Sequence, residues 1–233
     1  MRKLLAGILI SLLVFLLLCE FTLPELAGQA VEREVSSSSL KPEGVEARLF
    51  AFPAAKILVG QFDGMRLEVR GANLGGCRAS LLAMQIPRGS FNLHELMESG
   101  GATALHADGP MQVRIVFREE DLNKYLRATG VPGITDPGLE LNSRYVKLKG
   151  KVGILGSSFS VQMWGNFRPE ENGEIAFSPI DFRVGNESLP PELSRKLASR
   201  LRFHLNGDRL PFAFKVKQVD VEQGCLVISG ESI

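Results

Sequence analysis

Apolar and polar residues alternate with a period of two along much of this chain, and no other feature constrains the fold as strongly. In YVKLKGKVGI, Val146 and Leu148 lie on one side while Lys147 and Lys149 lie on the other. Successive side chains of a β-strand point to opposite faces, so this pattern predicts half-buried antiparallel strands. Four segments share the pattern: 65–70, 111–117, 145–154 and 159–167.

Two further runs, 174–184 and 211–222, also alternate, but each changes phase once. The changes fall near Pro179 and Gln218. A β-bulge or a sharp bend inserts such a change of phase and increases the local twist of the strand. The sequence therefore predicts an α+β protein with a long, strongly curved antiparallel sheet.

After Phe117 the apolar period becomes helical, because Leu122, Tyr125 and Leu126 fall on one face of a helix. Three consecutive acids at 119–121 precede this face. Clustered carboxylates also occur in catalytic pairs and metal sites, but consecutive helical positions point in three directions. Acids in the first turn are stabilised by the helix dipole, so we expect these three to begin a helix.

A second helix is predicted at 189–207, after LPP and before Gly207. Its basic side either faces solvent or meets anionic lipid headgroups. Its apolar stripe contains Leu193, Leu197, Ala198, Leu201 and Leu205. Its basic side contains Arg195, Lys196, Arg200 and Arg202. A third, shorter helix is predicted at 90–101.

The N-terminus has two basic residues before the apolar run Leu4–Cys19. This arrangement predicts a signal-anchor or transmembrane segment at 1–23 that places the rest of the chain outside the cytoplasmic membrane. Residues 24–44 are predicted to be a short helix and a Ser-rich tether, and residues 45–233 the globular domain. The protein is then single-pass in the cell membrane, or secreted if the signal peptide is cleaved after Ala30.

Composition excludes several functions. A net charge of +1 provides no basic field for nucleic acid. The three histidines stand alone in the sequence, and no CxxC or HExxH motif is present, so we expect no metal, no cofactor and no enzyme activity. Export would permit a disulfide between Cys77 and Cys225, but two cysteines without a motif more often occupy small apolar positions of a fold.

Several short patterns occur in a fixed order: FDGMRLEVRGANL, FREEDLNKYL, GNFRPEENGEIAFSPIDFRVGNESLPPEL and LPFAFKVKQVDVEQGCLVISG. Together with the N-terminal segment, they resemble the LmeA-type family of bacterial extracytoplasmic phospholipid-binding proteins from Val45 to Gly230. The resemblance implies a TULIP-like tubular fold, in which the curved sheet wraps around two or three helices and leaves an apolar groove for acyl chains. Arg118 departs from the family, where a hydroxyl cap is expected.

The working hypothesis is a membrane-tethered phospholipid-binding protein of the cell envelope, because the strands present more apolar surface than the few helices can cover. The predicted groove residues are Leu122, Tyr125, Leu126, Phe159, Met163, Leu193, Leu197 and Leu201. The predicted headgroup residues are Arg195, Arg200 and Arg202. One alternative is an envelope enzyme or accessory factor for lipid-linked glycans, for which the isolated acids are Asp63, Asp181 and Asp208. Another alternative is a structural or interaction protein whose interior is packed by its own side chains and has no room for a lipid.

Overall fold

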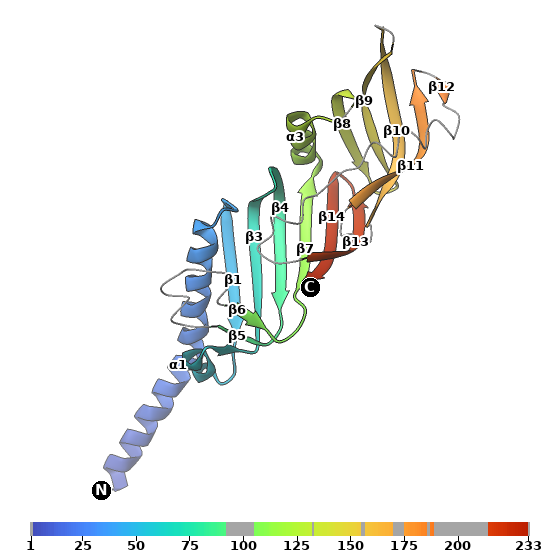
Figure 1. Ribbon diagram of the computed structural model, residues 1–233. Coiled ribbons are helices and arrows are strands. Elements are labelled where there is room, and N and C mark those ends of the chain that lie inside the picture. Colours follow the sequence, from blue (N-terminus) through green and yellow to red (C-terminus); the bar gives the residue numbers. More distant parts are fainter. Residues whose placement is uncertain are drawn as a thin grey trace. The chain divides into compact units, whose positions relative to one another are not determined.

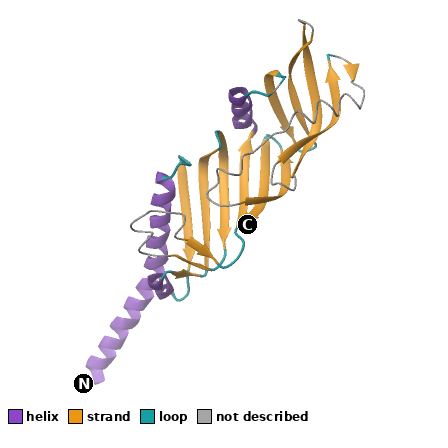
Figure 2. Ribbon diagram, in the orientation of Figure 1, coloured by secondary structure: helices purple, strands orange, loops and turns teal. Residues whose placement is uncertain are grey.

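The computed structural model describes residues 2–91, 105–131, 133–154, 157–169, 175–185, 187–188 and 214–232. The described chain is mostly antiparallel sheet with few helices, which confirms the predicted α+β class (Figures 1 and 2). It forms two compact units. Unit 1 comprises Met1–Val69 and Ala83–Gln112, and unit 2 comprises Arg70–Leu82 and Val113–Ile233.

The first helix and the short strands belong to unit 1. Its elements are α1 (Arg2–Ser37), β1 (Gly44–Phe50), the 3-10 helix η1 (Ala54–Val59), β2 (Gln61–Phe62), β5 (Gly89–Phe91) and β6 (Leu105–Ala107). Two long strands, β3 (Gly64–Leu74) and β4 (Cys77–Ile86), contribute residues to both units.

Unit 2 contains the longer strands and one described helix. Its elements are β7 (Gln112–Arg118, whose first residue lies in unit 1), α3 (Glu119–Thr129), β8 (Thr135–Asn142), β9 (Tyr145–Ile154), β10 (Ser157–Pro169), β11 (Ile175–Val184), β12 (Glu187–Ser188), β13 (Phe214–Glu222) and β14 (Cys225–Ser232).

The strands form three sheets. The six-stranded sheet has the order β1-β3-β4-β7-β14-β13, the five-stranded sheet β12-β11-β10-β9-β8, and the three-stranded sheet β2-β5-β6. None of the sheets in the described part of the chain closes on itself. Two strands at the ends of these orders, β1 and β8, are therefore edge strands.

Helix α1 runs without a break to Ser37, so it includes the first two of the four consecutive serines in the predicted tether. The hydroxyls of Ser36 and Ser37 donate to backbone carbonyls one turn earlier, those of Glu32 and Glu34, so both serines are accommodated in the last turn. Within the described residues, no helix has the length and apolar character needed to cross a bilayer.

Both predicted phase changes are confirmed as irregularities in strand pairing. The register of β10 and β11 shifts between Trp164 and Gly165, whose partners are Asp181 and Pro179, so Ile180 has no partner. The register of β13 and β14 shifts between Val216 and Gln218. Each inserted residue moves the following side chains to the opposite face, as the sequence pattern requires.

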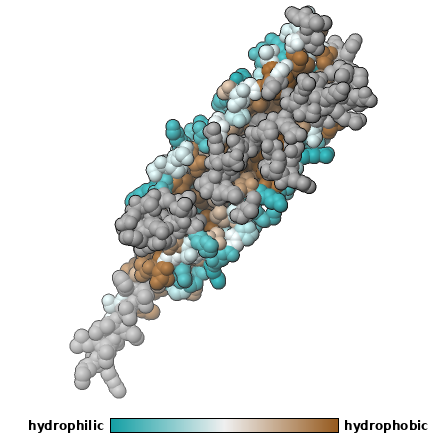
Figure 3. Space-filling model, in the orientation of Figure 1, coloured by the Kyte–Doolittle hydropathy of each residue, from teal (hydrophilic) through white to brown (hydrophobic). Residues whose placement is uncertain are grey.

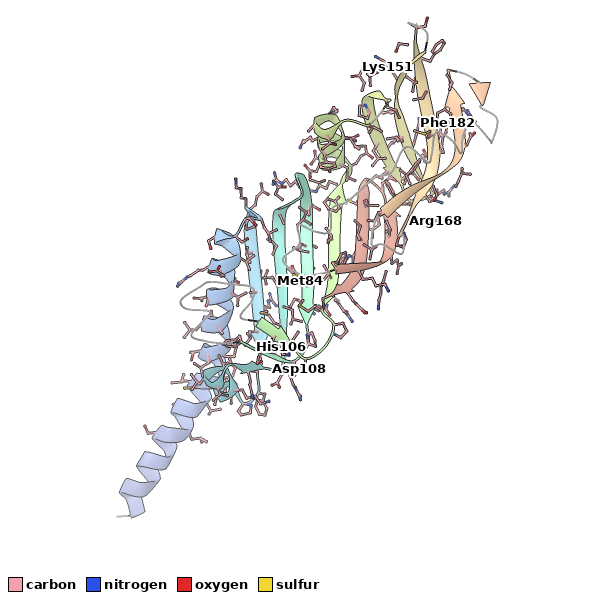
Figure 4. All side chains as sticks on the ribbon, in the orientation of Figure 1. Met84, His106, Asp108, Lys151, Arg168 and Phe182 are labelled. Carbon is pink, nitrogen blue, oxygen red and sulfur yellow. The ribbon has the colours of Figure 1, made fainter. Side chains whose placement is uncertain are left out.

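The other sequence predictions have mixed outcomes. The helix expected after Phe117 is confirmed as α3. The helix expected at 90–101 is wrong at its start, because Ser90 pairs with Gln61 and His106 in a β-ladder (His106 is labelled in Figure 4). The rest of that segment, and the helix expected at 189–207, lie outside the described residues.

Candidate lipid-binding site

One face of the five-stranded sheet is apolar. Leu139, Leu148, Met163 and Phe182 stand directly opposite one another on β8, β9, β10 and β11. All four are buried, and Met163 has no exposed surface (Figure 4 labels Phe182). A row of large apolar side chains across four strands is the kind of surface that must be covered by other apolar groups.

The apolar face continues along β10 in both directions. Toward its C-terminal end, Phe167 contacts Phe177 of β11 edge to face, with ring centroids 5.7 Å apart. Toward its N-terminal end, Phe159 lies on the same face as Met163 and pairs with Val152. Phe159 is 41% exposed, so the apolar face reaches a position where a bound molecule could contact an aromatic ring.

The opposite face of the same strands is polar and carries the single tryptophan of the chain. Two cations lie over the Trp164 ring, with Lys147 Nζ 5.4 Å and the guanidinium carbon of Arg183 5.1 Å from its centroid. Arg183 also pairs with Asp181 at 3.3 Å, and Lys147 with Glu140 at 3.8 Å. This cluster was not predicted as a site, because Trp164 and Lys147 lie on different strands and are brought together only by the pairing of β9 and β10.

Unit 1 has a separate feature, an open cleft of about 590 Å³ between α1 and the end of β1. Its lining residues are mostly apolar: Glu20, Phe21, Pro24, Leu49, Phe50, Ala51, Phe52 and Asp63. Both carboxylates of the cleft are engaged. Glu20 Oε2 accepts from the Ala54 N–H at 2.7 Å, and Asp63 Oδ2 accepts from the Phe52 N–H at 2.7 Å.

The Asp63 carboxylate also accepts from Lys56 Nζ at 2.9 Å. The hydrogen bond from the Phe52 N–H makes the larger contribution to lowering the pKa of Asp63 below its ordinary value, and the hydrogen bond from Lys56 makes the next largest. The carboxylate is therefore charged and structural at neutral pH. It lacks the raised pKa that a general acid would need.

One comparison with known proteins identifies the family of the chain. The family model described as LmeA-like phospholipid-binding matches residues 19–231, nearly the whole chain. The chain belongs to the LmeA-like phospholipid-binding family. A search of the curated proteins and a search of the solved structures each found no significant match.

Membership of the LmeA-like family supports lipid binding. On the apolar face of the five-stranded sheet the central row is buried, and Phe159 is exposed. Of the predicted groove residues, Met163 is central to this face and Phe159 lies at its exposed end. Leu193, Leu197 and Leu201, with the predicted headgroup residues Arg195, Arg200 and Arg202, lie outside the described residues.

The remaining predicted groove residues lie on α3. Leu122 and Leu126 are buried, and the Tyr125 ring lies beside Gly76 of the β3–β4 turn. Helix α3 as a whole packs against the edge strand β8. The contact of Leu122, Tyr125 and Leu126 with lipid stays a prediction.

The three acids that begin α3 each have a structural partner. Glu119 Oε2 accepts from the Leu141 N–H at 2.7 Å. Asp121 pairs with Lys124 at 3.2 Å, and Glu120 lies 3.8 Å from Arg118. No cluster of three His, Cys, Asp or Glu suited to a metal ion occurs among the described residues. The cluster fixes the start of the helix, as the sequence predicted.

The cysteines are free thiols. Burial, with a smaller contribution from the nearby Asp121 carboxylate, raises the pKa of the Cys77 thiol to about 12. The thiol therefore stays protonated at neutral pH and is a poor nucleophile. Cys77 occupies a small apolar position of the core, which was one of the two alternatives considered for it.

Proposed function

We propose that this protein binds a phospholipid by holding its acyl chains against the apolar face of the five-stranded sheet. The family match over residues 19–231 is the observation that carries this proposal. The row Leu139–Leu148–Met163–Phe182 supplies the apolar surface, and Phe159 provides its accessible end. The predicted curved, tubular wrap of the sheet around helices is part of the proposal, since it would enclose the chains on more than one side.

The energetics of such binding do not require a specific polar contact. Removing one methylene from water stabilises the complex by about 0.8 kcal/mol, so eight methylenes contribute about 6 kcal/mol before the entropy of ordering the chain is subtracted. Selectivity among phospholipids would then depend on cations near the headgroup, for which the predicted candidates are Arg195, Arg200 and Arg202.

We further propose that residues 1–23 tether the domain to the cytoplasmic membrane from the extracytoplasmic side, in the service of envelope lipid handling. The support is the apolar run that follows Arg2 and Lys3. Two measurements test this part: the full chain should stay with the membrane after alkaline carbonate washing, and protease added to spheroplasts should digest its domain. A chain released by carbonate, or protected until the cells are lysed, would contradict the tether or its orientation.

Native mass spectrometry of the full chain, released from membranes in a mild detergent, tests lipid binding directly. We expect a phospholipid bound at one molecule per chain in the wild type and at least tenfold less in Phe159→Asp, because a carboxylate at this position would meet the acyl chain. Ile180→Asp is the matched control. Ile180 lies on the same sheet and is 76% exposed, but it has no partner in the apolar rows.

Equal lipid occupancy in Phe159→Asp and the control would exclude this face as the acyl-chain site. A wild-type chain that carries no phospholipid, and takes up none from vesicles, would contradict the proposed function itself. Circular dichroism of each variant would separate loss of lipid from loss of fold.

A further inference from the structure

Large apolar side chains are exposed on unit 1: three line the cleft beside α1, and two lie on η1, which packs on α1. Phe21, Phe50, Phe52, Leu58 and Val59, here called the apolar rim, are 76%, 54%, 78%, 63% and 71% exposed. Figure 3 shows hydrophobic surface beside α1, at the end of unit 1 from which the N-terminal part of the helix extends. Soluble proteins rarely leave such side chains uncovered together, so the apolar rim indicates a contact with an apolar phase.

The apolar rim is held by hydrogen bonds and packing. Helix η1, which carries Leu58 and Val59, packs on α1, and its Ala54 N–H donates to Glu20 Oε2 at 2.7 Å. Phe52 is fixed through its backbone N–H to Asp63. The orientation of these side chains is therefore set by the same contacts that attach η1 to α1.

The position of Glu20 on α1 decides what can cover the apolar rim. Glu20 follows the apolar run Leu4–Cys19 directly, so η1 is attached to the helix at the point where that run ends. Several described side chains of the run are exposed on the same helix. They are Ile10, Leu13, Val14, Leu17 and Leu18. An apolar phase that covers these residues extends to Phe21 and the apolar rim without interruption.

The charges beside the apolar rim indicate how it would bind. Lys56 and Arg88 lie 2.9 Å and 3.8 Å from the Asp63 carboxylate, and Glu20 is the second carboxylate of the cleft. Both cations pair with Asp63, and Glu20 is a second carboxylate, so the four charges described beside the cleft cancel. Insertion of apolar side chains, rather than attraction to charged headgroups, should govern the contact.

We propose that the apolar rim inserts into the interfacial layer of a phospholipid bilayer and seats unit 1 on the membrane where α1 leaves it. The inference rests on the proposed tether at residues 1–23. It adds a second membrane contact that fixes the orientation of unit 1, and it requires no anionic lipid.

Quenching of tryptophan fluorescence by brominated lipid tests the insertion in the full chain. The only tryptophan is replaced in Trp164→Phe, and Phe52→Trp then introduces a single reporter in the apolar rim. In vesicles of phosphatidylcholine brominated near the start of the acyl chains, we expect at least twofold quenching and a blue-shifted emission maximum. Added salt should leave the quenching unchanged.

Ser37→Trp in the same background is the matched control. Ser37 is exposed at the end of α1, and 17 residues of helix at 1.5 Å per residue place it about 25 Å from Glu20. We expect its emission to be unquenched. Leu58→Trp provides a second reporter in the apolar rim if Phe52→Trp disturbs the fold.

The outcomes separate this inference from the proposed function. Quenching at position 52 no greater than at position 37, in protein that floats with the vesicles, overturns the insertion and leaves the tether intact. Protein that does not float with the vesicles overturns both. Strong quenching at position 52 in a chain that carries no phospholipid by mass spectrometry supports the insertion and contradicts lipid binding.

Discussion

Each unit covers an exposed sheet edge with a helix, but the two helices do so by different chemistry. In unit 1, α1 lies against the edge strand β1, and in unit 2, α3 lies against the edge strand β8. An uncovered edge presents a row of unpaired N–H and C=O groups that can pair with another chain. Both helices place a carboxylate on this row: Glu32 accepts from the Ala47 N–H, and Glu119 accepts from the Leu141 N–H.

The two edges differ in the partners of their other backbone N–H and C=O groups. Asn123 of α3 pairs with both backbone groups of Leu139, accepting from its N–H at 2.6 Å and donating to its carbonyl at 2.8 Å. The Gly224 N–H donates to the Leu141 carbonyl at 3.1 Å. With the bond from the Leu141 N–H to Glu119, the backbone N–H and C=O groups of both Leu139 and Leu141 have hydrogen-bond partners. An additional strand would provide partners of the same kind.

Helix α1 instead approaches β1 closely at Gly28, where a Cβ atom would lie 2.6 Å from the Ala47 carbonyl oxygen. One edge is covered through side-chain hydrogen bonds and the other largely through backbone contact. In unit 1, the glycine at position 28 is what lets the helix backbone approach the edge strand so closely.

The largest predicted effect tests that close contact. Gly28→Val should destabilise unit 1 by about 2–4 kcal/mol, because the new atoms overlap a backbone carbonyl that cannot move without distorting β1. Ala30→Val, at an exposed position of the same helix, should change the free energy of unfolding by less than about 1 kcal/mol. Urea unfolding measures both, and equal effects would contradict the close approach.

A somewhat smaller effect is expected on the polar edge. Asn123→Ala should destabilise unit 2 by about 2–3 kcal/mol, because it leaves two backbone groups of Leu139 without partners. Asn123→Asp keeps the acceptor for the Leu139 N–H but loses the donor. It should therefore destabilise unit 2 by about half as much as Asn123→Ala. Faster hydrogen exchange at the Leu139 amide would locate the effect, and unchanged exchange would contradict it.

Glu119→Ala and Glu32→Ala compare the two edges at the one interaction that they share. Each should lower the free energy of unfolding by about 1–2 kcal/mol and speed hydrogen exchange at Leu141 and Ala47 respectively. The Gln variants keep an oxygen acceptor and should lose less. A Glu32→Ala variant as stable as the wild type would show that α1 covers β1 by backbone contact alone.

The smallest effect concerns the pH dependence of unit 1. The pKa of Asp63 is lowered, so its contribution to stability is present above the ordinary value of 3.8 and is lost as the pH falls through the lower folded value. Asp63→Asn should lower the urea midpoint of unfolding at pH 6. The urea midpoints at pH 6 and pH 3 should then differ less than they do in the wild type. Lys56→Met should also reduce the difference between the urea midpoints at pH 6 and pH 3. If this difference is the same as in the wild type in both variants, Asp63 is not the source of the pH dependence.

The strands themselves were largely predictable, because alternation reports which face of a strand is buried and depends only on neighbouring residues. β9 occupies the predicted 145–154, and both bulges fall at the predicted phase changes. β1 and β4 were not among the predicted strands. In β4 the adjacent Leu81 and Leu82 interrupt the alternation, so a local pattern could not identify it.

The sequence alone determined the antiparallel α+β class, the start of α3 at three acids, and membership of a phospholipid-binding family. Only the tertiary structure decided which strands become edges and what covers them. Nothing local distinguishes Gly28, Glu32 or Asn123 from ordinary helical residues. Their roles exist because pairing between distant segments leaves β1 and β8 at the ends of their sheets, and that pairing depends on the whole chain.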